Sequence, residues 1–398
     1  MSGTLFKNAK IIDGNGGLPI IDGEFIVIDG VIQDIQNQSE INNNKIEIYD
    51  TVDLSGKTVI PGLIDCHVHI LFDSQINPID NLVNETILST ILRVVKNLEN
   101  LLKGGITYFR DLGGYEYLEI QVKQEILRGN IKGPEFNACG KIITTTGGHA
   151  WKIGRECDGE SNSLKAVREQ IKAGADLIKI ATTGGILTEG VDIESPQFSS
   201  KEILIMVEEA HNANKKVAAH AQGILGIKNA IEAGVDSIEH GFFLDDEAIQ
   251  GMLQNDIYLV PTLLAHNLIL YNDSEEELPK HMVEKAKRSI EAHYDSFIKA
   301  YKSGIKIAMG TDAGTTFNIH GQFADELLHM VNLGMSPMDA IVSATKISSE
   351  LIGINESHGT IEKNKYADFI VLENDPLEDI NALKDVNRVY KHGNLVVS

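Results

Sequence analysis

The sequence is poor in cysteine and lacks a long apolar run. Its 398 residues include only three cysteines, Cys66, Cys139 and Cys157. An odd number of widely spaced cysteines is neither a disulfide framework nor a CxxC zinc site. No stretch approaches the ~20 apolar residues that a membrane span needs, and residues 1–14 have no apolar core of signal-peptide length. We therefore expect a soluble, cytoplasmic protein.

Positive charge is also scarce. The chain has 35 Lys and Arg against 57 Asp and Glu, a net charge of −22. Such a surface repels nucleic-acid phosphates and anionic membranes, which excludes both as partners. We expect a small-molecule substrate and a homo-oligomer.

The pattern of expected elements divides the chain into three segments. Residues 1–57 have short strands separated by turns, which is typical of a β module. In residues 58–356 apolar strands alternate with helical stretches, which favours parallel β/α units. Residues 357–398 become β-like again, and we expect them to pair with the first segment in one composite β-sandwich domain.

The middle segment has the size of a (β/α)₈ TIM-like barrel, an α/β fold whose active site lies at the carboxyl ends of its strands. The candidate barrel strands are 58–60 with 63–66, 107–110, 142–145, 177–181, 217–220, 237–239, 258–260 and 307–310. The intervening helical stretches include 201–214, 225–233 and 245–254.

Potential metal ligands occur at or near the ends of five of these strands. They are His67, His69, Lys179, His220, His240 and Asp312. A lone histidine at a strand end is more often a hydrogen-bonded structural residue, and Asp312 also fits a turn. Lys179 carries more weight, because an ammonium group inside a barrel is costly unless it is paired or neutralised. We expect all six side chains at one mouth of the barrel.

These residues, together with the stretches 61–69 and 359–371, resemble the amidohydrolase superfamily in its binuclear branch. The resemblance implies that two divalent ions are bound, one by His67, His69 and Asp312 and the other by His220 and His240, with N6-carboxylated Lys179 between them. It also implies hydrolysis of an amide bond by a metal-bridging hydroxide. Zinc is the expected metal, since imidazole and carboxylate ligands suit it. Asp312 is the expected catalytic acid and base.

Three loops, 145–149, 180–185 and 238–241, are similar to those of prolidase-like, zinc-dependent dipeptidases and carboxypeptidases. The resemblance implies removal of a C-terminal residue from dipeptides or N-acyl amino acids. It also implies that His149 is catalytic and binds the scissile carbonyl oxygen, although a structural loop cap would also suit a histidine there.

Three residues are candidates for substrate binding: Gln222, Arg155 and His320. Gln222 stands where some prolidase-like relatives have Tyr, and its amide could bond a substrate carboxylate. The guanidinium of Arg155 could bind that carboxylate bidentately, or could simply be solvated. His320 is expected near the barrel mouth.

The side chain of the released residue is less clearly indicated. Glu189, Asp192 and Glu194, in the loop after the fourth strand, favour a C-terminal Arg or Lys, although most loop acids face water. An Xaa-Pro dipeptidase remains an alternative. A mononuclear cyclic-amide hydrolase of the imidazolonepropionase type, with Lys179 uncarboxylated, is another, and a scaffold without turnover is a third. Deaminases of the superfamily usually have a His followed by a catalytic Glu after the fifth strand. The stretch 220–223 has no Glu, which argues against deamination.

Overall fold

The computed structural model describes residues 2–37, 47–272 and 278–398. The chain forms two compact units. One comprises Met1–Asp65, Glu99–Tyr108 and Gly321–Ser398, and the other comprises Cys66–Leu98 and Phe109–His320. The sequence predicts domain boundaries after residues 57 and 356, which differ from the boundaries of these two units. The predicted domain boundaries stay a prediction. Among the helices of the described ranges, none is both long and apolar enough to cross a bilayer.

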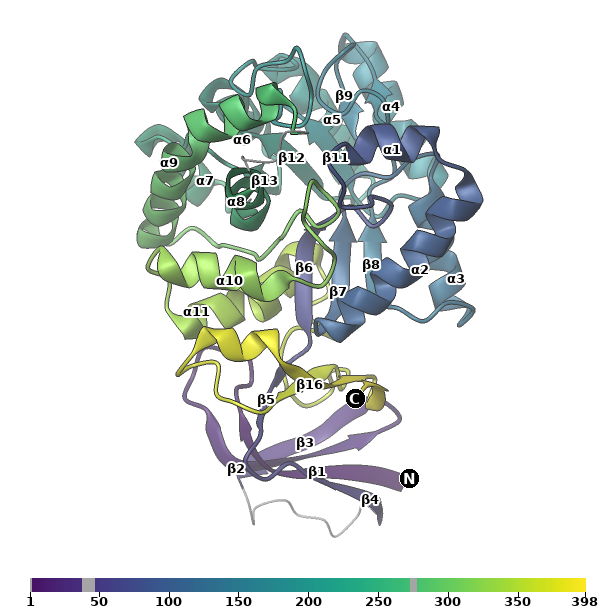
Figure 1. The fold of residues 1–398 in the computed structure, drawn as a ribbon, viewed down its shortest axis with the longest axis vertical. Coiled ribbons are helices and arrows are strands. Elements are labelled where there is room, and N and C mark those ends of the chain that lie inside the picture. The colour runs from purple at the N-terminus through teal and green to yellow at the C-terminus, as the bar shows by residue number, and fades with distance from the viewer. Residues whose placement is uncertain (1, 38–46, 273–277) are drawn as a thin grey trace. The chain divides into compact units, whose positions relative to one another are not determined.

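The first unit contains a mixed eight-stranded sheet to which both ends of the chain contribute (Figure 1). Its strands are β1 (Ser2–Ile11), β2 (Ile20–Ile28), β3 (Val31–Asn37), β4 (Glu47–Asp53), β5 (Thr58–Pro61), β15 (Phe369–Leu372), β16 (Val386–Lys391) and β17 (Asn394–Val397). The order is β17-β16-β15-β5-β1-β2-β3, with β4 beside β1. β5 pairs in parallel with β1 and antiparallel with β15. The tail and the N-terminal strands thus share one sheet, as predicted, but β15 joins it through β5, which the sequence placed in the barrel.

Aromatic side chains fill the core of this unit. Phe6 stacks on Phe25 with ring centroids 5.0 Å apart, and Phe369 stacks on Tyr390 at 4.5 Å. All four are buried. Phe369 and Val371 both point into this core, because side chains alternate between the two faces of a strand. The unit also contains α10 (Phe323–Asn332), α11 (Pro337–Val342), a π-helical turn (Ser343–Ile347), α12 (Ser348–Ile352) and a 3₁₀ turn (Ile380–Lys384).

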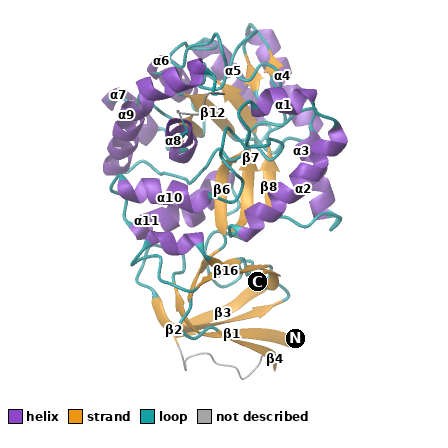
Figure 2. Ribbon diagram, in the orientation of Figure 1, coloured by secondary structure: helices purple, strands orange, loops and turns teal. Residues whose placement is uncertain are grey.

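The strands of the second unit lie inside a ring of helices, as Figure 2 shows. β6 (Leu63–Val68), β7 (Ile106–Asp111) and β8 (Glu135–Ala138) form one sheet, in which the first three residues of β6 and of β7 belong to the first unit. A second sheet contains β9 (Ile143–Thr144), β10 (Arg155–Glu156), β11 (Ile178–Ala181), β12 (Val217–Ala221), β13 (Ser237–His240) and β14 (Tyr258–Val260). The helices are α1 (Pro78–Asn84), α2 (Ile87–Lys103), α3 (Leu118–Leu127), α4 (Glu160–Ala173), α5 (Ser200–Asn212), α6 (Ile224–Ala233), α7 (Asp246–Gln254), α8 (Leu263–Tyr271) and α9 (Lys280–Ser303). The last five residues of α2 belong to the first unit.

Backbone hydrogen bonds close these strands into a barrel. The amide of Asp176, before β11, donates to the carbonyl oxygen of Ala138 in β8 at 2.8 Å. The segment 307–310 lies between β14 and β6. The amide of Ala308 donates to the carbonyl oxygen of Leu259 in β14 at 3.0 Å, and the amide of Cys66 in β6 donates to the carbonyl oxygen of Met309 at 2.9 Å. The predicted fold class, an α/β (β/α)₈ barrel with a β-rich domain from both termini, is confirmed.

Three of the predicted barrel strands differ in detail. The predicted strand 58–60 is β5, which belongs to the sheet of the first unit, and β6 alone begins the barrel. β8 lies beside β7, whereas the predicted strand 142–145 corresponds to β9, which pairs with β10 and β11. The predicted strand 307–310 forms only a single bridge, Leu259 to Ile307.

Gly310 lets this last segment approach its neighbours. A Cβ atom at Gly310 would lie 2.4 Å from Cγ1 of Val260 and 2.9 Å from Cβ of His67. Contacts this short require a neighbour to move, so glycine is needed where the backbone passes between these two strands.

Candidate metal centre

The six residues expected at the barrel mouth line one cavity of the second unit. Their positions follow from the strands: His67 in β6 with His69 just after it, Lys179 in β11, His220 in β12, His240 at the end of β13, and Asp312 beyond the segment 307–310. The strands are parallel, so their carboxyl ends meet at the same end of the barrel. The structure therefore brings together all six residues that the sequence singles out.

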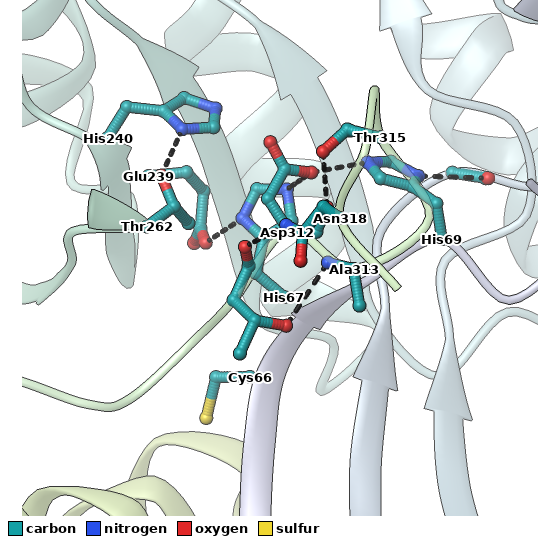
Figure 3. Close-up of polar contacts among 12 residues, drawn as sticks. Cys66, His67, His69, Glu239, His240, Thr262, Asp312, Ala313, Thr315 and Asn318 are labelled. Atoms are coloured by element: carbon teal, nitrogen blue, oxygen red, sulfur yellow. Dashed lines mark hydrogen bonds and ion pairs between the residues drawn. The ribbon is translucent and has the colours of Figure 1, made fainter. Parts of the chain in front are cut away.

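Asp312 lies between His67 and His69 (Figure 3). Its Oδ1 atom is 3.2 Å from Nε2 of His69 and 3.5 Å from Nε2 of His67. Potential ligand atoms of the three residues all lie within 4.8 Å of one another. This spacing suits three ligands of one ion.

His220 and His240 approach this group from the neighbouring strands. The ring centroid of His240 is 4.7 Å from that of His220 and 5.1 Å from that of His67. All three imidazoles are buried, and desolvation lowers the pKa of each well below its usual value of 6.5. They are therefore neutral at pH 7, which is the form that binds a metal.

Hydrogen bonds fix which nitrogen of each imidazole faces the cavity. Nδ1 of His67 donates to Oε2 of Glu239 at 2.8 Å, and Nδ1 of His69 lies 3.3 Å from the Gly113 carbonyl oxygen. Both rings therefore direct the lone pair of Nε2 toward Asp312.

The other two histidines are fixed in a similar way. Nε2 of His220 lies 2.9 Å from the carbonyl oxygen of Gly184, which accepts its proton and leaves Nδ1 as the ligand atom. Nδ1 of His240 lies 2.7 Å from the Thr262 hydroxyl oxygen, whose own proton goes to the Pro261 carbonyl. The Thr262 oxygen must therefore accept the hydrogen bond from Nδ1 of His240. The proton of His240 is on Nδ1, and the lone pair of Nε2 is available to a metal.

This donor set fits divalent cations. Two imidazole lone pairs point at Oδ1 of Asp312, a buried atom for which the described residues provide no hydrogen-bond partner. Electron-pair donors in such proximity repel one another, and a cation between them removes that repulsion. Nitrogen and oxygen ligands of this kind suit zinc and other first-row ions.

Lys179 completes the ring of ligand-type groups. It is 1% exposed, and its Nζ atom has no hydrogen-bond partner within the described ranges. Desolvation lowers its pKa to about 8, with Glu239 acting in the opposite direction. A buried amine without a partner is unusual, and it fits a group whose partner is the metal centre.

A buried ion pair stands behind His67. Nη2 of Arg110 donates to Oε1 of Glu239 at 2.8 Å, and the hydroxyl of Ser237 donates to the same oxygen at 2.5 Å. Nε of Arg110 also donates to the carbonyl oxygen of Cys66 at 2.6 Å. Arg110 and Glu239 are not among the site residues predicted from the sequence. Both could have been found by the criterion applied to Lys179, namely a charged residue inside an apolar strand.

His149 lies against the candidate ligands. Its ring stacks on that of His220 with centroids 4.1 Å apart, and its Nδ1 lies 3.0 Å from the hydroxyl oxygen of Thr188. Burial lowers the pKa of His149 well below its usual value. With Nδ1 bonded to Thr188, Nε2 is the nitrogen available to a ligand in the cavity, which His149 lines.

Of the three substrate-binding candidates, only Gln222 lines this cavity. Its Oε1 atom is buried and has no hydrogen-bond partner in the described parts of the chain. Nε of Arg155 instead donates to Glu169 at 2.5 Å, and Nε2 of His320 donates to the backbone oxygen of His69 at 3.1 Å. Neither Arg155 nor His320 is among the residues that line the cavity.

The acids expected to receive a cationic side chain also lie elsewhere. Asp192 forms an ion pair with Arg288, and Glu194 is exposed. Glu189 borders a separate, outer cavity. Among the described residues, Asp312 is the only acid that lines the cavity at the candidate ligands.

Comparison with known proteins agrees with this arrangement. A family model described as "Amidohydrolase family" matches residues 58–396. Ochratoxinase of Aspergillus niger is 29% identical over 428 residues, which covers 98% of this chain and 86% of that protein. Its crystal structure superposes with a TM-score of 0.89 and covers 99% of this chain and 95% of that one.

A second solved structure is similar over its whole length. It is described as a Xaa-Pro dipeptidase with bound methionine in the active site, and it is 34% identical with a TM-score of 0.91. The superposition covers 100% of each chain.

Proposed function

The chain belongs to the amidohydrolase family and is a hydrolase of carbon–nitrogen bonds; from this premise we propose that it releases the C-terminal residue of dipeptides or N-acyl amino acids. The observation that carries the proposal is the convergence of four histidines, Asp312 and Lys179 on one cavity, with the imidazole lone pairs directed inward.

We propose that the site holds two zinc ions. His67, His69 and Asp312 would hold one, His220 and His240 the other, and a carbamate on Nζ of Lys179 would contact both. Paired divalent ions lower the pKa of water and polarise a carbonyl group. The buried, unpartnered Nζ of Lys179 supports the carbamate, since its depressed pKa leaves a larger neutral fraction of the amine, the form that reacts with carbon dioxide.

The chain's own residues would orient the substrate and move the proton. Asp312, through its carboxylate, takes a proton from the attacking water and returns it to the leaving amine. Nε2 of His149 donates to the scissile carbonyl oxygen. The side-chain amide of Gln222 bonds the carboxylate of the released residue.

The cavity favours an uncharged side chain on that residue. Apart from the candidate ligands, His149, His266 and Gln222, its described lining is largely apolar and includes Phe72, Ile142, Ile153, Ile186, Phe242 and Ile269. A cationic side chain would lose its hydration there without gaining an ion pair. We therefore propose Pro, Met or Leu in place of the Arg or Lys that the sequence suggests. The Xaa-Pro dipeptidase with bound methionine supports the same choice.

The test is kcat/KM for zinc-loaded protein with glycyl dipeptides that end in Pro, Met, Leu, Arg, Lys or Glu. We expect at least tenfold preference for an apolar residue over Arg and Lys, which is about 1.4 kcal/mol. Tenfold preference for Arg or Lys would restore the prediction from the sequence. Opening of a cyclic amide with no peptide hydrolysed would favour the imidazolonepropionase-like alternative.

A further inference from the structure

The cavity at the candidate ligands adjoins a larger, outer cavity. The inner cavity has a volume of about 70 Å³ and the outer one about 640 Å³. Ile79, Ala150 and Leu187 line both. The inner cavity is therefore much the smaller of the two. We infer that the bulkier part of a substrate lies in the outer cavity, which we call the vestibule.

Two loops lead from the inner cavity into the vestibule. In the first, His149 lines the inner cavity, Ala150 lines both and Trp151 lines the vestibule. In the second, Leu187 is shared and Thr188 lies outside. The amide of Ala150 donates to the Thr188 hydroxyl oxygen at 3.1 Å, which ties the two loops together. His149 is therefore one residue from the shared lining and two residues from Trp151, so a group attached to a carbonyl bound at His149 can extend into the vestibule.

The vestibule offers an aromatic surface. Trp151 is the only tryptophan of the chain, and 43% of it is exposed. Pro78, Pro279 and Met282 add apolar walls. Charged side chains also line the vestibule: Glu189 and Lys280, and Lys152, which forms an ion pair with Asp80 and whose Nζ lies over the Trp151 ring at 5.9 Å from its centroid. A large, partly exposed indole beside apolar walls is a surface on which a planar aromatic group can stack.

We propose that the vestibule binds a planar aromatic N-acyl group against Trp151, while the released residue occupies the inner cavity. This inference rests on the proposed function. The orientation follows from the sizes of the two cavities, because the small inner cavity suits the single residue that is released. The larger vestibule suits an acyl group that can be bulky.

The kinetic test compares N-acetyl-alanine with N-(2-naphthoyl)-alanine as substrates of the zinc-loaded enzyme. We expect kcat/KM at least tenfold higher for the naphthoyl compound. In Trp151→Ala this ratio should fall below threefold, and in Trp151→Phe it should be largely retained. Leu204→Ala, which truncates an exposed side chain on α5, is the matched control and should keep the wild-type ratio.

Fluorescence provides a second readout that does not depend on turnover. Because Trp151 is the only tryptophan, it dominates the emission excited at 295 nm. We expect N-(4-nitrobenzoyl)-alanine to quench it saturably in protein stripped of metal, and N-acetyl-alanine to leave it unchanged.

The outcomes separate the two proposals. Hydrolysis of both substrates with equal kcat/KM, or a naphthoyl preference that survives in Trp151→Ala, would overturn the vestibule assignment and leave the proposed function intact. Failure to hydrolyse any N-acyl amino acid or dipeptide would overturn the proposed function, and the vestibule assignment would fall with it.

Discussion

Oε2 of Glu239 lies 2.8 Å from Nδ1 of His67, and both residues are buried. The carboxylate therefore holds the proton of His67 on Nδ1 and directs the lone pair of Nε2 into the cavity. Its negative charge is balanced by Arg110, 2.8 Å from its other oxygen. Partners of this kind orient metal-ligating histidines and increase their basicity.

Replacing Glu239 should therefore affect both metal binding and stability. In Glu239→Gln we expect metal affinity to fall about 10–100-fold. We also expect a loss of about 3–5 kcal/mol in the free energy of unfolding, because Arg110 is left as an unpaired buried charge. Metal titration and urea denaturation measure the two effects. Glu232→Gln, at an exposed position on α6, is the control.

A double variant tests the cause. Arg110→Met combined with Glu239→Gln removes the buried charge and should recover part of the lost stability without recovering metal affinity. Unchanged metal affinity in Glu239→Gln would show that Glu239 does not orient a ligand.

Asp312→Asn should separate proton transfer from folding. Asp312 has a φ of 61°, a backbone conformation that Asn adopts readily, so the loop should be retained. We expect kcat to fall about 10²–10⁴-fold, the range typical of general acid–base groups. Near-normal turnover, with metal content confirmed by elemental analysis, would assign the proton transfer to another group.

Gly185→Ala should displace His149. A Cβ atom at Gly185 would lie 2.3 Å from Cε1 and 2.4 Å from Nδ1 of His149, so the imidazole must move. We expect a fall in kcat of about tenfold or more with little change in metal content, since His149 is proposed to bind the carbonyl and not the ions. Gly17→Ala is the control, because a Cβ atom there meets nothing within 4 Å. Equal activity of the two variants would count against the role of His149.

His320 should affect the pH dependence of stability. Burial lowers its pKa from 6.5 to about 4 in the folded protein, so the unfolded chain binds this proton at higher pH than the folded one. As the pH falls from 6.5 toward 4, the proton binds the unfolded chain and not the folded one. The free energy of unfolding therefore decreases over this range, by up to about 3 kcal/mol, and the contribution of His320 is complete only above pH 6.5.

The variant His320→Gln keeps a donor for the His69 carbonyl and removes the titration. Its free energy of unfolding should fall less than that of the wild type between pH 6.5 and 4.5, by about 2 kcal/mol. Urea denaturation across this range measures the difference. Identical pH dependence in the two proteins would mean that His320 is not held neutral by burial.

The strand-end residues could be predicted from the sequence because parallel strands place their carboxyl ends together. To predict the positions of Lys179 and the four histidines, it was enough to place β6, β11, β12 and β13 correctly. Apolar runs in the sequence mark those strands. The third barrel strand was misplaced because both 135–138 and 142–145 are short, and only tertiary pairing distinguishes β8 from β9.

Side chains in loops could not be placed in the same way. Arg155 was a reasonable carboxylate ligand by its chemistry, but its partner is Glu169, fourteen residues away on α4. Glu189, Asp192 and Glu194 follow a barrel strand closely, yet none of them lines the inner cavity. Their environment depends on contacts that strand periodicity does not encode.

The central claim is a binuclear centre with a modified lysine, and a crystal structure of the zinc-loaded, active protein tests it most directly. Data collected on both sides of the zinc absorption edge should give two anomalous peaks per chain, one beside His67, His69 and Asp312 and one beside His220 and His240. Electron density should extend from Nζ of Lys179 as a carbamate between them. A single peak with an unmodified Lys179 in fully active protein would contradict the account.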